Sequence, residues 1–407
     1  MRRSATLIAA VVATGLSLGT GPRVEAQLPL RIGASVSQTG SFAAVSQDQL
    51  RGYQLCVKHA NEKGGVLGRR IELLAEDDQS NAASAAALYE RLITRDKVDA
   101  ILGPSTSPIT EAVADVTEKH KMPMVAPFAA ATSIFKKGRK FIFMVYPASE
   151  VFFEGLVEMA ATKGLKTLAL INEDTIGAKA VAQGTIGLAK KKGLQVVLTE
   201  AYPKGTTDFS AILSRVRAAN PDVLAASSYF EDAVAITRQS KALNVNPKMF
   251  GVTAGGPRSY ETLGRDAEFV YGTLIWDAQL VTLRAGGLIP IARQYPGARE
   301  FAESYKKEFQ GAAPSTHFSA AGYAGCQIFL EAVKRAGSLE SEKVRDVILK
   351  MDLHTVFGAF KVDRDGFQIA HRMLMFQWQD GKKVIVWPDE LAPVKARFPT
   401  PPWSQRQ

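Results

Sequence analysis

The chain has 407 residues, a formal net charge of +10 and only two cysteines. This length is enough for two domains that each bury a core, and two cysteines exclude the disulfide framework of a small secreted protein. The basic residues are scattered, apart from short runs at residues 136–140 and 190–192 that contain no aromatic residues. We interpret these runs as a solvated loop and a helix end, so nucleic acid is not an expected partner.

Residues 1–26 have the composition of a secretory signal peptide. The basic start Met1-Arg2-Arg3 precedes an apolar run over residues 5–18, and the small-x-small pattern at residues 24–26 fits a cleavage site. No other segment has an apolar run long enough to span a membrane. We therefore expect a mature chain that is exported and soluble.

Strands and helices alternate through most of the mature chain. We expect strands at residues 28–34, 71–75, 98–102, 124–126, 141–145, 167–171, 194–198, 223–226 and 249–252, with helices between them at 47–61, 81–94, 108–120, 151–163, 178–192, 209–219 and 232–243. Such alternation predicts parallel sheets flanked by helices, with right-handed crossovers. Because the series occurs twice, we expect an α/β protein of two similar lobes.

The remainder of the chain is predicted to return through both lobes. We expect a strand at residues 270–276, helices at 297–309, 319–335 and 341–350, and strands at 357–362, 373–378 and 383–387. Asp380-Gly381 joins the last two strands and is a hairpin signal. Residues 389–407 are Pro-rich and predict either an extended wrap or a loose tail. No low-complexity linker separates the lobes, which favours a hinged pair with several crossing segments.

The segment at residues 98–127 predicts an anion site. A short buried strand is followed by Gly103-Pro104 and then by Ser107-Pro108, where proline favours the first helical position and makes Ser107 an N-cap candidate. A helix N-terminus offers unpaired backbone N–H groups and a favourable dipole to an anion. In open α/β sheets, ligands bind beyond the carboxyl ends of the strands. We therefore expect Ser107 and its loop to bind a ligand carboxylate.

Cys56 and Cys326 each fall in a predicted helix. An exported protein can pair them, but the geometry of a disulfide is demanding. We therefore favour two buried free thiols over a disulfide.

Several motifs resemble one family, the periplasmic substrate-binding proteins of ABC transporters with the type I fold, in the branched-chain (leucine/isoleucine/valine-binding) subgroup. The resemblance covers nearly the whole mature chain, and its motifs lie at residues 61–73, 77–78, 103–107, 37–40 and 208–210. It implies two lobes joined by three crossing segments, with a ligand between them. The crossings should fall near Tyr146, Trp276 and residues 353–356. The resemblance implies a first lobe of residues 27–146 with 277–353, and a second of 147–276 with 354–388.

The resemblance also implies which residues bind the ligand. The carboxylate-binding serine of the family falls on Ser107, and the loop at residues 127–132 should add backbone groups around Phe128 and Ala130 and the Thr132 hydroxyl. In the second lobe, an aromatic residue that faces the ligand falls on Tyr229. Phe42 is expected to line an apolar cleft with these residues, whereas Tyr146 and Trp276 are expected to pack at the hinge rather than to contact the ligand.

Two departures from the family pattern concern the ligand's amino group. Amino-acid binders of the family usually have an acidic residue where this chain has Ala254, and often a tyrosine where it has Ile176. A desolvated ammonium without a carboxylate is costly. The ligand is then one without an amino group, unless Glu173, Asp174 or Glu231 supplies the missing charge.

The sequence contains no recognisable catalytic set, phosphate loop or metal-ligand spacing among its five histidines. We expect no enzyme activity, no metal and no cofactor. Two hypotheses stand equally: a periplasmic receptor for hydrophobic amino acids that delivers them to an ABC permease, or such a receptor for an amine-free carboxylate or amide. A ligand-sensing adaptor for a membrane receptor is the alternative of another class. A monomer is expected in each case.

Overall fold

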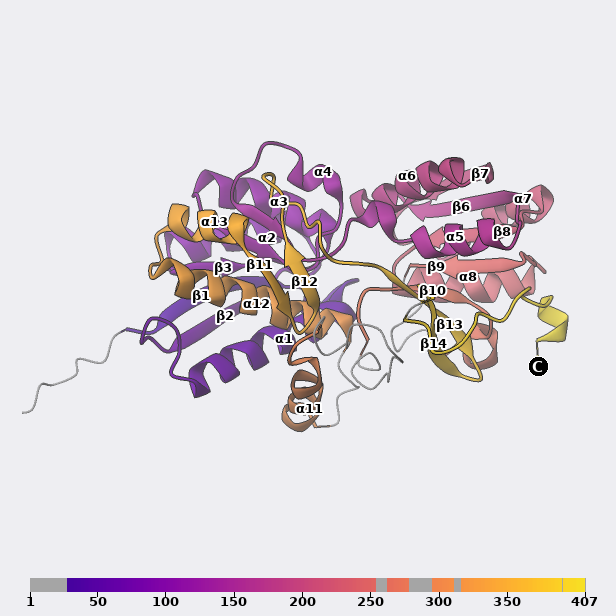
Figure 1. The fold of residues 1–407 in the computed structure, drawn as a ribbon. Helices are drawn as coiled ribbons and strands as arrows, with labels where there is room; N and C mark the ends of the chain where they lie inside the picture. Colours follow the sequence, from indigo (N-terminus) through magenta and orange to yellow (C-terminus); the bar gives the residue numbers. More distant parts are fainter. Residues whose placement is uncertain (1–27, 254–261, 278–294, 311–315, 390, 407) are drawn as a thin grey trace, which may run out of the picture.

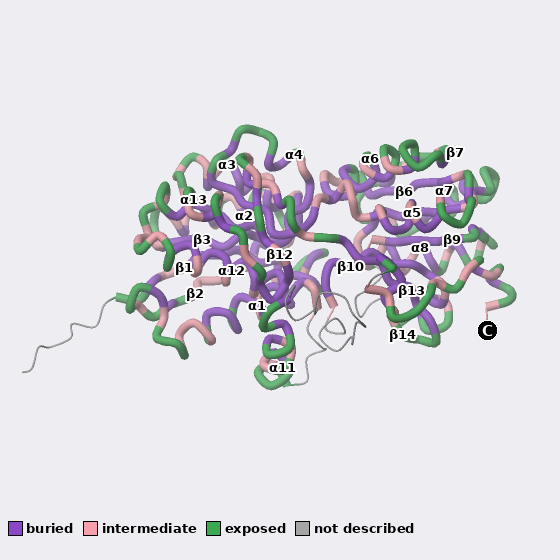
Figure 2. Tube along the Cα trace, viewed as in Figure 1, coloured by how far each residue is buried: buried purple, intermediate pink, exposed green. Residues whose placement is uncertain are grey.

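The structure is a computed structural model that describes residues 28–253, 262–277, 295–310, 316–389 and 391–406. The predicted signal peptide and Ala254 lie outside the described residues. The chain forms two lobes, each a sheet flanked by helices (Figure 1), as the sequence predicts. The inner strands of both sheets are buried, whereas the edge strands β2 (Ile71–Asp77) and β7 (Gln195–Tyr202) are partly exposed (Figure 2).

The first lobe is built on a five-stranded parallel sheet of order β2-β1-β3-β4-β5. The strands β3, β4 and β5 are short, wholly buried apolar runs, as expected where helices cover both faces of a parallel sheet. The strands are β1 (Leu30–Val36), β2 (Ile71–Asp77), β3 (Ala100–Leu102), β4 (Met124–Ala126) and β5 (Ile142–Met144), and the helices are α1 (Ala43–Glu62), α2 (Ala82–Thr94), α3 (Ser107–Lys119), α4 (Thr132–Phe135), α11 (Ala298–Glu308), α12 (His317–Ala336) and α13 (Ser341–Lys350).

The second lobe contains a seven-stranded sheet of order β14-β13-β10-β9-β8-β6-β7. Five of its strands are parallel, and β13 and β14 run antiparallel at one edge. The predicted hairpin is confirmed, with Asp380 and Gly381 both at positive φ. The strands are β6 (Thr167–Glu173), β7 (Gln195–Tyr202), β8 (Val223–Ser227), β9 (Met249–Val252), β10 (Tyr271–Leu274), β13 (Leu374–Gln379) and β14 (Lys382–Trp387), and the helices are α5 (Glu154–Thr162), α6 (Ile176–Lys191), α7 (Ser210–Ala219), α8 (Phe230–Ala242) and the short turns η1 (Ser149–Val151) and η2 (Gly264–Ala267).

The crossing segment after β10 is fixed by hydrogen bonds to the first lobe and to the last crossing segment. Trp276, which follows β10, is fully buried and donates its indole N–H to the carbonyl of Val356 at 2.9 Å. The ring Nε2 of His371 lies 3.1 Å from the carbonyl oxygen of Ile275. These contacts place Trp276 at the hinge.

The third crossing lies later in the chain than the predicted residues 353–356, because the segment that follows them still packs on the first lobe. A two-stranded ribbon forms from β11 (Asp352–Thr355) and β12 (Gly358–Lys361). Beyond it, Gly366 accepts a hydrogen bond from the Met144 N–H of β5 at 2.8 Å, and the Gln368 side chain donates to the Val145 carbonyl at 3.2 Å. The passage into the second sheet therefore lies between Gln368 and β13, where one extended segment spans the lobes in Figure 1.

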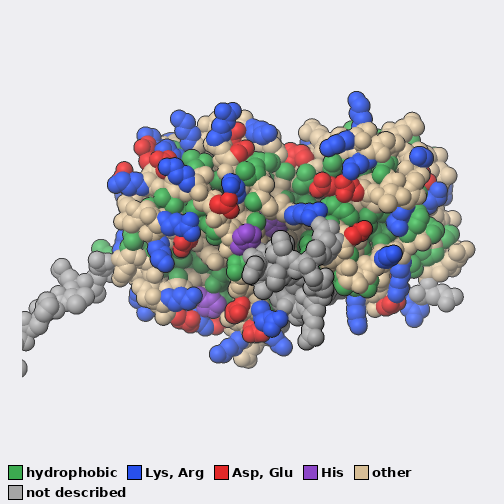
Figure 3. Space-filling model, in the orientation of Figure 1, with side chains coloured by type: hydrophobic (Ala, Val, Ile, Leu, Met, Phe, Trp, Pro, Cys, Tyr) green, Lys and Arg blue, Asp and Glu red, His purple; other side chains and the backbone are tan. Residues whose placement is uncertain are grey.

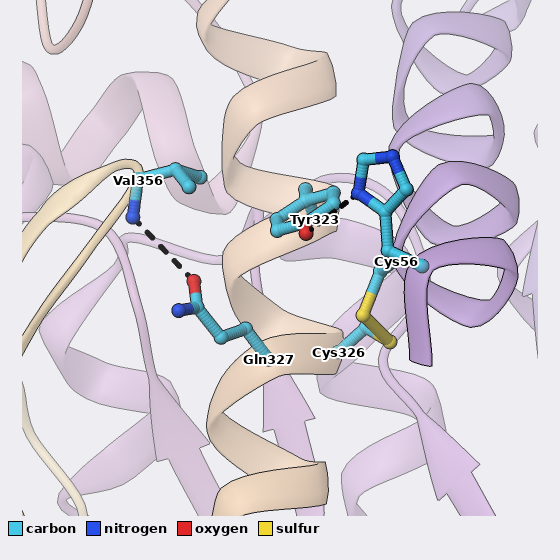
Figure 4. Close-up of a disulfide and its surroundings, with 6 residues drawn as sticks. Cys56, Tyr323, Cys326, Gln327 and Val356 are labelled. Atoms are coloured by element: carbon cyan, nitrogen blue, oxygen red, sulfur yellow. Dashed lines mark hydrogen bonds between the residues drawn. A yellow bond between two sulfur atoms is a disulfide. The ribbon is translucent and has the colours of Figure 1, made fainter. Parts of the chain in front are cut away.

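Cys56 of α1 and Cys326 of α12 form a disulfide, so the prediction of two free thiols is wrong. Figure 4 shows the bridge between the two helices. They approach closely because a glycine faces the partner on each side: a Cβ on Gly52 would stand 2.2 Å from the Ser319 carbonyl oxygen, and one on Gly322 would stand 2.6 Å from that of Gln49. The sequence places both cysteines in helices but contains no sign that these helices are neighbours.

The Pro-rich C-terminal residues form a wrap rather than a loose tail. Trp403, in the short turn η4 (Trp403–Gln405), is buried against the second lobe. Its indole N–H donates to the Val245 carbonyl at 2.7 Å. The backbone N–H of Thr400 donates to the Lys248 carbonyl at 2.9 Å. The end of the chain thus packs on the second lobe at the ends of its strands.

Candidate functional site: a cavity between the lobes

A cavity of about 110 Å³ lies between the two lobes. Both lobes and the first crossing contribute to its wall. The residues that line it are Val45, Thr106, Ser107, Phe128, Ala130, Tyr146, Ser149, Phe152, Gly177, Ala178, Val181, Ser227, Ser228, Tyr229, Phe230, Thr253, Thr273, Ile275, His317 and Phe318. Most of them follow the carboxyl ends of parallel strands, which is where an α/β sheet binds its ligands.

The N-terminus of α3 provides the first-lobe side of the cavity. Thr106 is the N-cap and Ser107 the first helical residue, so the prediction of Ser107 as N-cap is wrong by one position. Pro108 occupies the second helical position rather than the first, and both places tolerate its missing N–H. Thr106 adopts φ +61°, a backbone conformation that a β-branched residue rarely takes outside functional sites.

The Ser107 hydroxyl is oriented by the loop after β4. Its oxygen accepts hydrogen bonds from the backbone N–H groups of Ala130 at 3.2 Å and Ala131 at 3.3 Å. Two accepted bonds occupy both lone pairs of the oxygen, which leaves its proton to be donated. A buried serine held in this way donates to an acceptor such as a carboxylate.

Three further hydroxyls at the cavity are buried and have no hydrogen-bond partner among the described residues. They are Thr106 Oγ1, the Tyr146 hydroxyl and Ser228 Oγ. A buried hydroxyl without a partner costs about 1–3 kcal/mol. These three groups, one from each lobe and one from the crossing, are therefore suited to bind polar atoms of a ligand.

Hydroxyls that already have partners fix the wall formed by the second lobe. Thr253 Oγ1 donates to the Ser228 carbonyl at 2.7 Å and accepts from the Ser228 N–H at 2.9 Å. Thr273 donates to the Thr253 carbonyl at 2.7 Å, and Ser227 to the Ala178 carbonyl at 3.1 Å. These bonds hold the ends of β8, β9 and β10 in position around the cavity.

Aromatic rings from both lobes form much of the remaining wall. Phe128 stacks on Phe318 with ring centroids 4.4 Å apart, and Phe230 of the second lobe meets Phe318 edge-on at 5.5 Å. The ring centroids of Tyr146 and Phe128 lie 5.1 Å apart. Flat rings arranged in this way favour an apolar ligand body with a planar shape.

The lobes are in contact across the cavity. Gly177, near the start of α6, lies so close to the first lobe that a Cβ there would stand 3.4 Å from Ser107 Oγ. The ring centroid of Phe42, on the first lobe, lies 5.5 Å from that of Tyr229, on the second. The structure is therefore the closed form of the two lobes.

Among the described residues, no charged side chain lines the cavity. Burial, with a smaller contribution from Lys383, lowers the pKa of His317 to about 3, so its imidazole is neutral at physiological pH. Glu173 is buried and is not among the lining residues, and burial and the nearby Asp232 raise its pKa to about 7. Asp174 and Glu231 are exposed and do not line the cavity.

The structure brings together half of the residues that the sequence predicts for the site. Ser107, Phe128, Ala130 and Tyr229 line the cavity, and Tyr146, expected to pack at the hinge, does so as well. Three others fall outside the lining: Phe42, which contacts Tyr229 instead, Thr132 at the start of α4, and Ile176, whose neighbour Gly177 takes its place. Ala254 lies outside the described residues, directly after Thr253.

The lining residues that sequence reasoning missed include two informative groups. Ser227 and Ser228 stand between a predicted strand and a predicted helix, so the rule that selected Ser107 also selects them. His317 and Phe318 come from the start of α12, a long way along the chain. Nothing in their local sequence indicates that this helix end reaches the cavity.

Within the described parts of the chain, no cluster of potential metal ligands is present. None of the helices found there is long and apolar enough to cross a membrane. On the face shown in Figure 3, Lys and Arg side chains are dispersed over both lobes among acidic ones.

Comparison with known proteins agrees with the fold. A family model described as periplasmic binding protein matches residues 29–383. A Leu/Ile/Val-binding protein homolog 7 from Brucella abortus is 29% identical, over 97% of this chain and 99% of its own length. The solved structure of a leucine-binding protein from Thermotoga maritima is 25% identical, with a TM-score of 0.77 over 88% of this chain and 97% of that one. A solute-binding protein of an ABC transporter from R. palustris, solved in complex with benzoate, is 18% identical, with a TM-score of 0.75 over 88% of this chain and 95% of that one.

Proposed function

The chain belongs to the periplasmic binding protein family, and from that premise we propose that it captures a hydrophobic amino acid or a related small carboxylate between its lobes and delivers it to an ABC permease. The family consists of solute-binding proteins that are not enzymes. Delivery from the periplasm also requires export, for which residues 1–26 are the proposed cleaved signal peptide.

The Ser107 hydroxyl is the observation that supports a carboxylate most directly. Its proton is left to be donated at the N-terminus of α3, beside the unpartnered hydroxyl of Thr106. Backbone N–H groups at this helix end add to the attraction for an anion. The apolar rings opposite suit a hydrophobic ligand body, such as the side chain of leucine or the ring of benzoate that similar proteins bind.

Ligand binding is proposed to stabilise the closed arrangement. Ser107 of the first lobe and Gly177 of the second lie close together only when the lobes are closed, so a ligand between them contacts both at once. A ligand shifts the equilibrium between open and closed forms by its difference in affinity for them. The closed form is then the state recognised by the permease.

A thermal-shift screen followed by calorimetry tests the proposal. The panel contains branched-chain and aromatic amino acids, aliphatic and aromatic monocarboxylates, and the corresponding amides. A ligand at a hundred times its Kd should stabilise the protein by about 2.7 kcal/mol. If amides bind as well as carboxylates, or if no carboxylate binds, the proposal fails. Uptake of the ligand that binds, in cells with and without the permease, tests delivery.

A further inference from the structure

The described lining of the cavity contains oxygen donors and acceptors but no ionised group. An α-amino acid brings a carboxylate and an ammonium into such a cavity. The carboxylate finds the α3 N-terminus and the Ser107 hydroxyl. Among the described lining residues the ammonium finds only neutral oxygens, and a buried ammonium without a carboxylate partner loses much of its hydration energy without compensation.

The three acids that the sequence suggests as replacements, Glu173, Asp174 and Glu231, are not among the described residues that line the cavity. Asp174 is exposed and pairs with Lys179, and Glu231 is exposed on the first turn of α8. Glu173 is buried, with its Oε2 unpartnered. Because burial and the nearby Asp232 disfavour its ionisation, it carries only part of a negative charge near neutral pH.

A single negative charge, in contrast, is well accommodated. Hydroxyl and backbone dipoles bind an anion at a helix N-terminus without a basic side chain. Ser228 Oγ, on the second-lobe wall, is buried without a partner and suits a neutral polar atom or a bound water. The stacked pair Phe128 and Phe318, together with Phe230, offers the ligand body flat apolar surfaces.

We propose that the ligand is a monocarboxylate with an apolar, preferentially aromatic body and no amino group, and that Ser228 is a residue that determines this specificity. The inference rests on the proposed function, because it names the ligand class of the same cavity. Ser228 lines the cavity from the lobe opposite Ser107. A neutral hydroxyl there leaves an ammonium without a counter-charge.

Calorimetry with matched pairs of compounds tests the inference on the unmodified protein. The pairs are phenylalanine with phenylpropanoate, leucine with isocaproate, and phenylglycine with phenylacetate, and each pair differs only by the amino group. The amine-free member should bind at least about tenfold more tightly in every pair that binds. If the amino acid binds as tightly or more tightly, the inference is overturned and the proposed function stands. If no member of any pair binds, both are overturned.

A charge introduced at Ser228 provides the second arm of the test. In Ser228→Asp, a carboxylate replaces the hydroxyl, and Ser228→Asn is the control of the same size without the charge. Within each pair, the affinity for the amino acid relative to the amine-free compound should rise at least about tenfold in Ser228→Asp. The same ratio should change little in Ser228→Asn. Equal ratios in the two variants would overturn the role of Ser228. Unchanged melting temperatures establish that both variants fold.

Discussion

The ammonium of Lys204, on the second lobe, lies 4.3 Å from the ring centroid of Phe42 on the first. Phe42 in turn contacts the Tyr229 ring of the second lobe, so Phe42 lies between two side chains of the facing lobe. Lys204 is exposed, and a cation–π contact at an exposed site contributes about 0.5–1 kcal/mol. Because its partners are on different lobes, this contact exists only in the closed form.

Replacing Lys204 should therefore weaken ligand binding without unfolding the protein. Lys204→Ala removes a contact of the closed form and should lower affinity about two- to fivefold. Lys204→Arg retains a cation over the ring and should bind ligand as the parent does. Calorimetry on the three proteins provides the comparison, and an alanine variant with unchanged affinity would contradict a closing role for this contact.

Alanine substitutions at two glycines of α6 distinguish the effect of lobe closure on ligand affinity from the effect of helix propensity on stability. A Cβ at Gly177 meets Ser107 of the other lobe and the Tyr229 hydroxyl, whereas a Cβ at Gly187 meets nothing within 4 Å. Gly177→Ala should weaken binding by about 1–3 kcal/mol, the usual cost of overpacking.

Gly187→Ala is the matched control for this change. It should stabilise the protein against urea by about 0.5–1 kcal/mol and leave affinity unchanged, because alanine is the better helix former. Similar affinities for the two variants would mean that the lobes do not close as tightly in the ligand complex as in this structure.

The Ser107 hydroxyl should contribute strongly to affinity. Ser107→Ala removes the proposed donor to the ligand carboxylate and should weaken binding by about 1–3 kcal/mol, the range for a hydrogen bond to a charged group. Ser133→Ala, at an exposed position of the neighbouring helix α4, is the control and should bind as the parent does. Equal affinities for the two alanine variants would argue against a role for Ser107 in binding.

Glu173 should make the protein less stable as pH rises. Burial and Asp232 raise the pKa of its carboxyl to about 7 in the folded protein, against about 4.3 in an unfolded chain. The folded state therefore retains the proton longer. Its contribution to stability is complete below about pH 4.3 and is lost as pH rises through 7.

Glu173→Gln keeps the shape of the side chain and removes this titration. Urea unfolding from pH 5 to pH 8 should show the variant gaining stability relative to the parent as pH increases, with no further gain above about pH 8. A difference between the two proteins that is independent of pH would show that Glu173 ionises normally in the folded state.

Loss of the Cys56–Cys326 bridge should destabilise the first lobe. The two residues are 270 positions apart, and removing a native disulfide typically costs about 2–5 kcal/mol. The double variant Cys56→Ala, Cys326→Ala should unfold at lower urea concentration than the oxidised parent. A reductant should shift the parent in the same direction but leave the variant unaffected, and a parent that titrates as two free thiols would exclude the bridge.

Local sequence patterns were sufficient for the fold and for one side of the site. Ser107 was found because strand, loop and helix signals occur together around it, and the alternation of elements gave the two lobes. The N-cap was misplaced by one residue because proline is accepted at either of the first two helical positions. Such errors are small, since they concern a single turn of backbone.

Features that depend on contacts between distant segments were not accessible in this way. The disulfide requires α1 and α12 to be neighbours, and His317 and Phe318 reach the cavity only because α12 packs in the first lobe. Tyr146 was assigned to the hinge alone, because a single residue at a crossing can serve both as packing and as lining. Periodicity describes one element at a time and contains no information on these arrangements.

The bridge between α1 and α12 also has a consequence for the order of assembly. The first lobe is discontinuous, since its sheet comes from the early chain and α12 from the late chain, with the second lobe's parallel strands encoded between them. Cys56 is synthesised long before Cys326, so the first lobe cannot be completed until most of the chain has been made. Oxidation then joins the two separate stretches covalently within one lobe. Opening and closing of the cleft leave this cross-link unstrained, and its redox state should alter the lifetime of the folded protein but not its affinity for ligand.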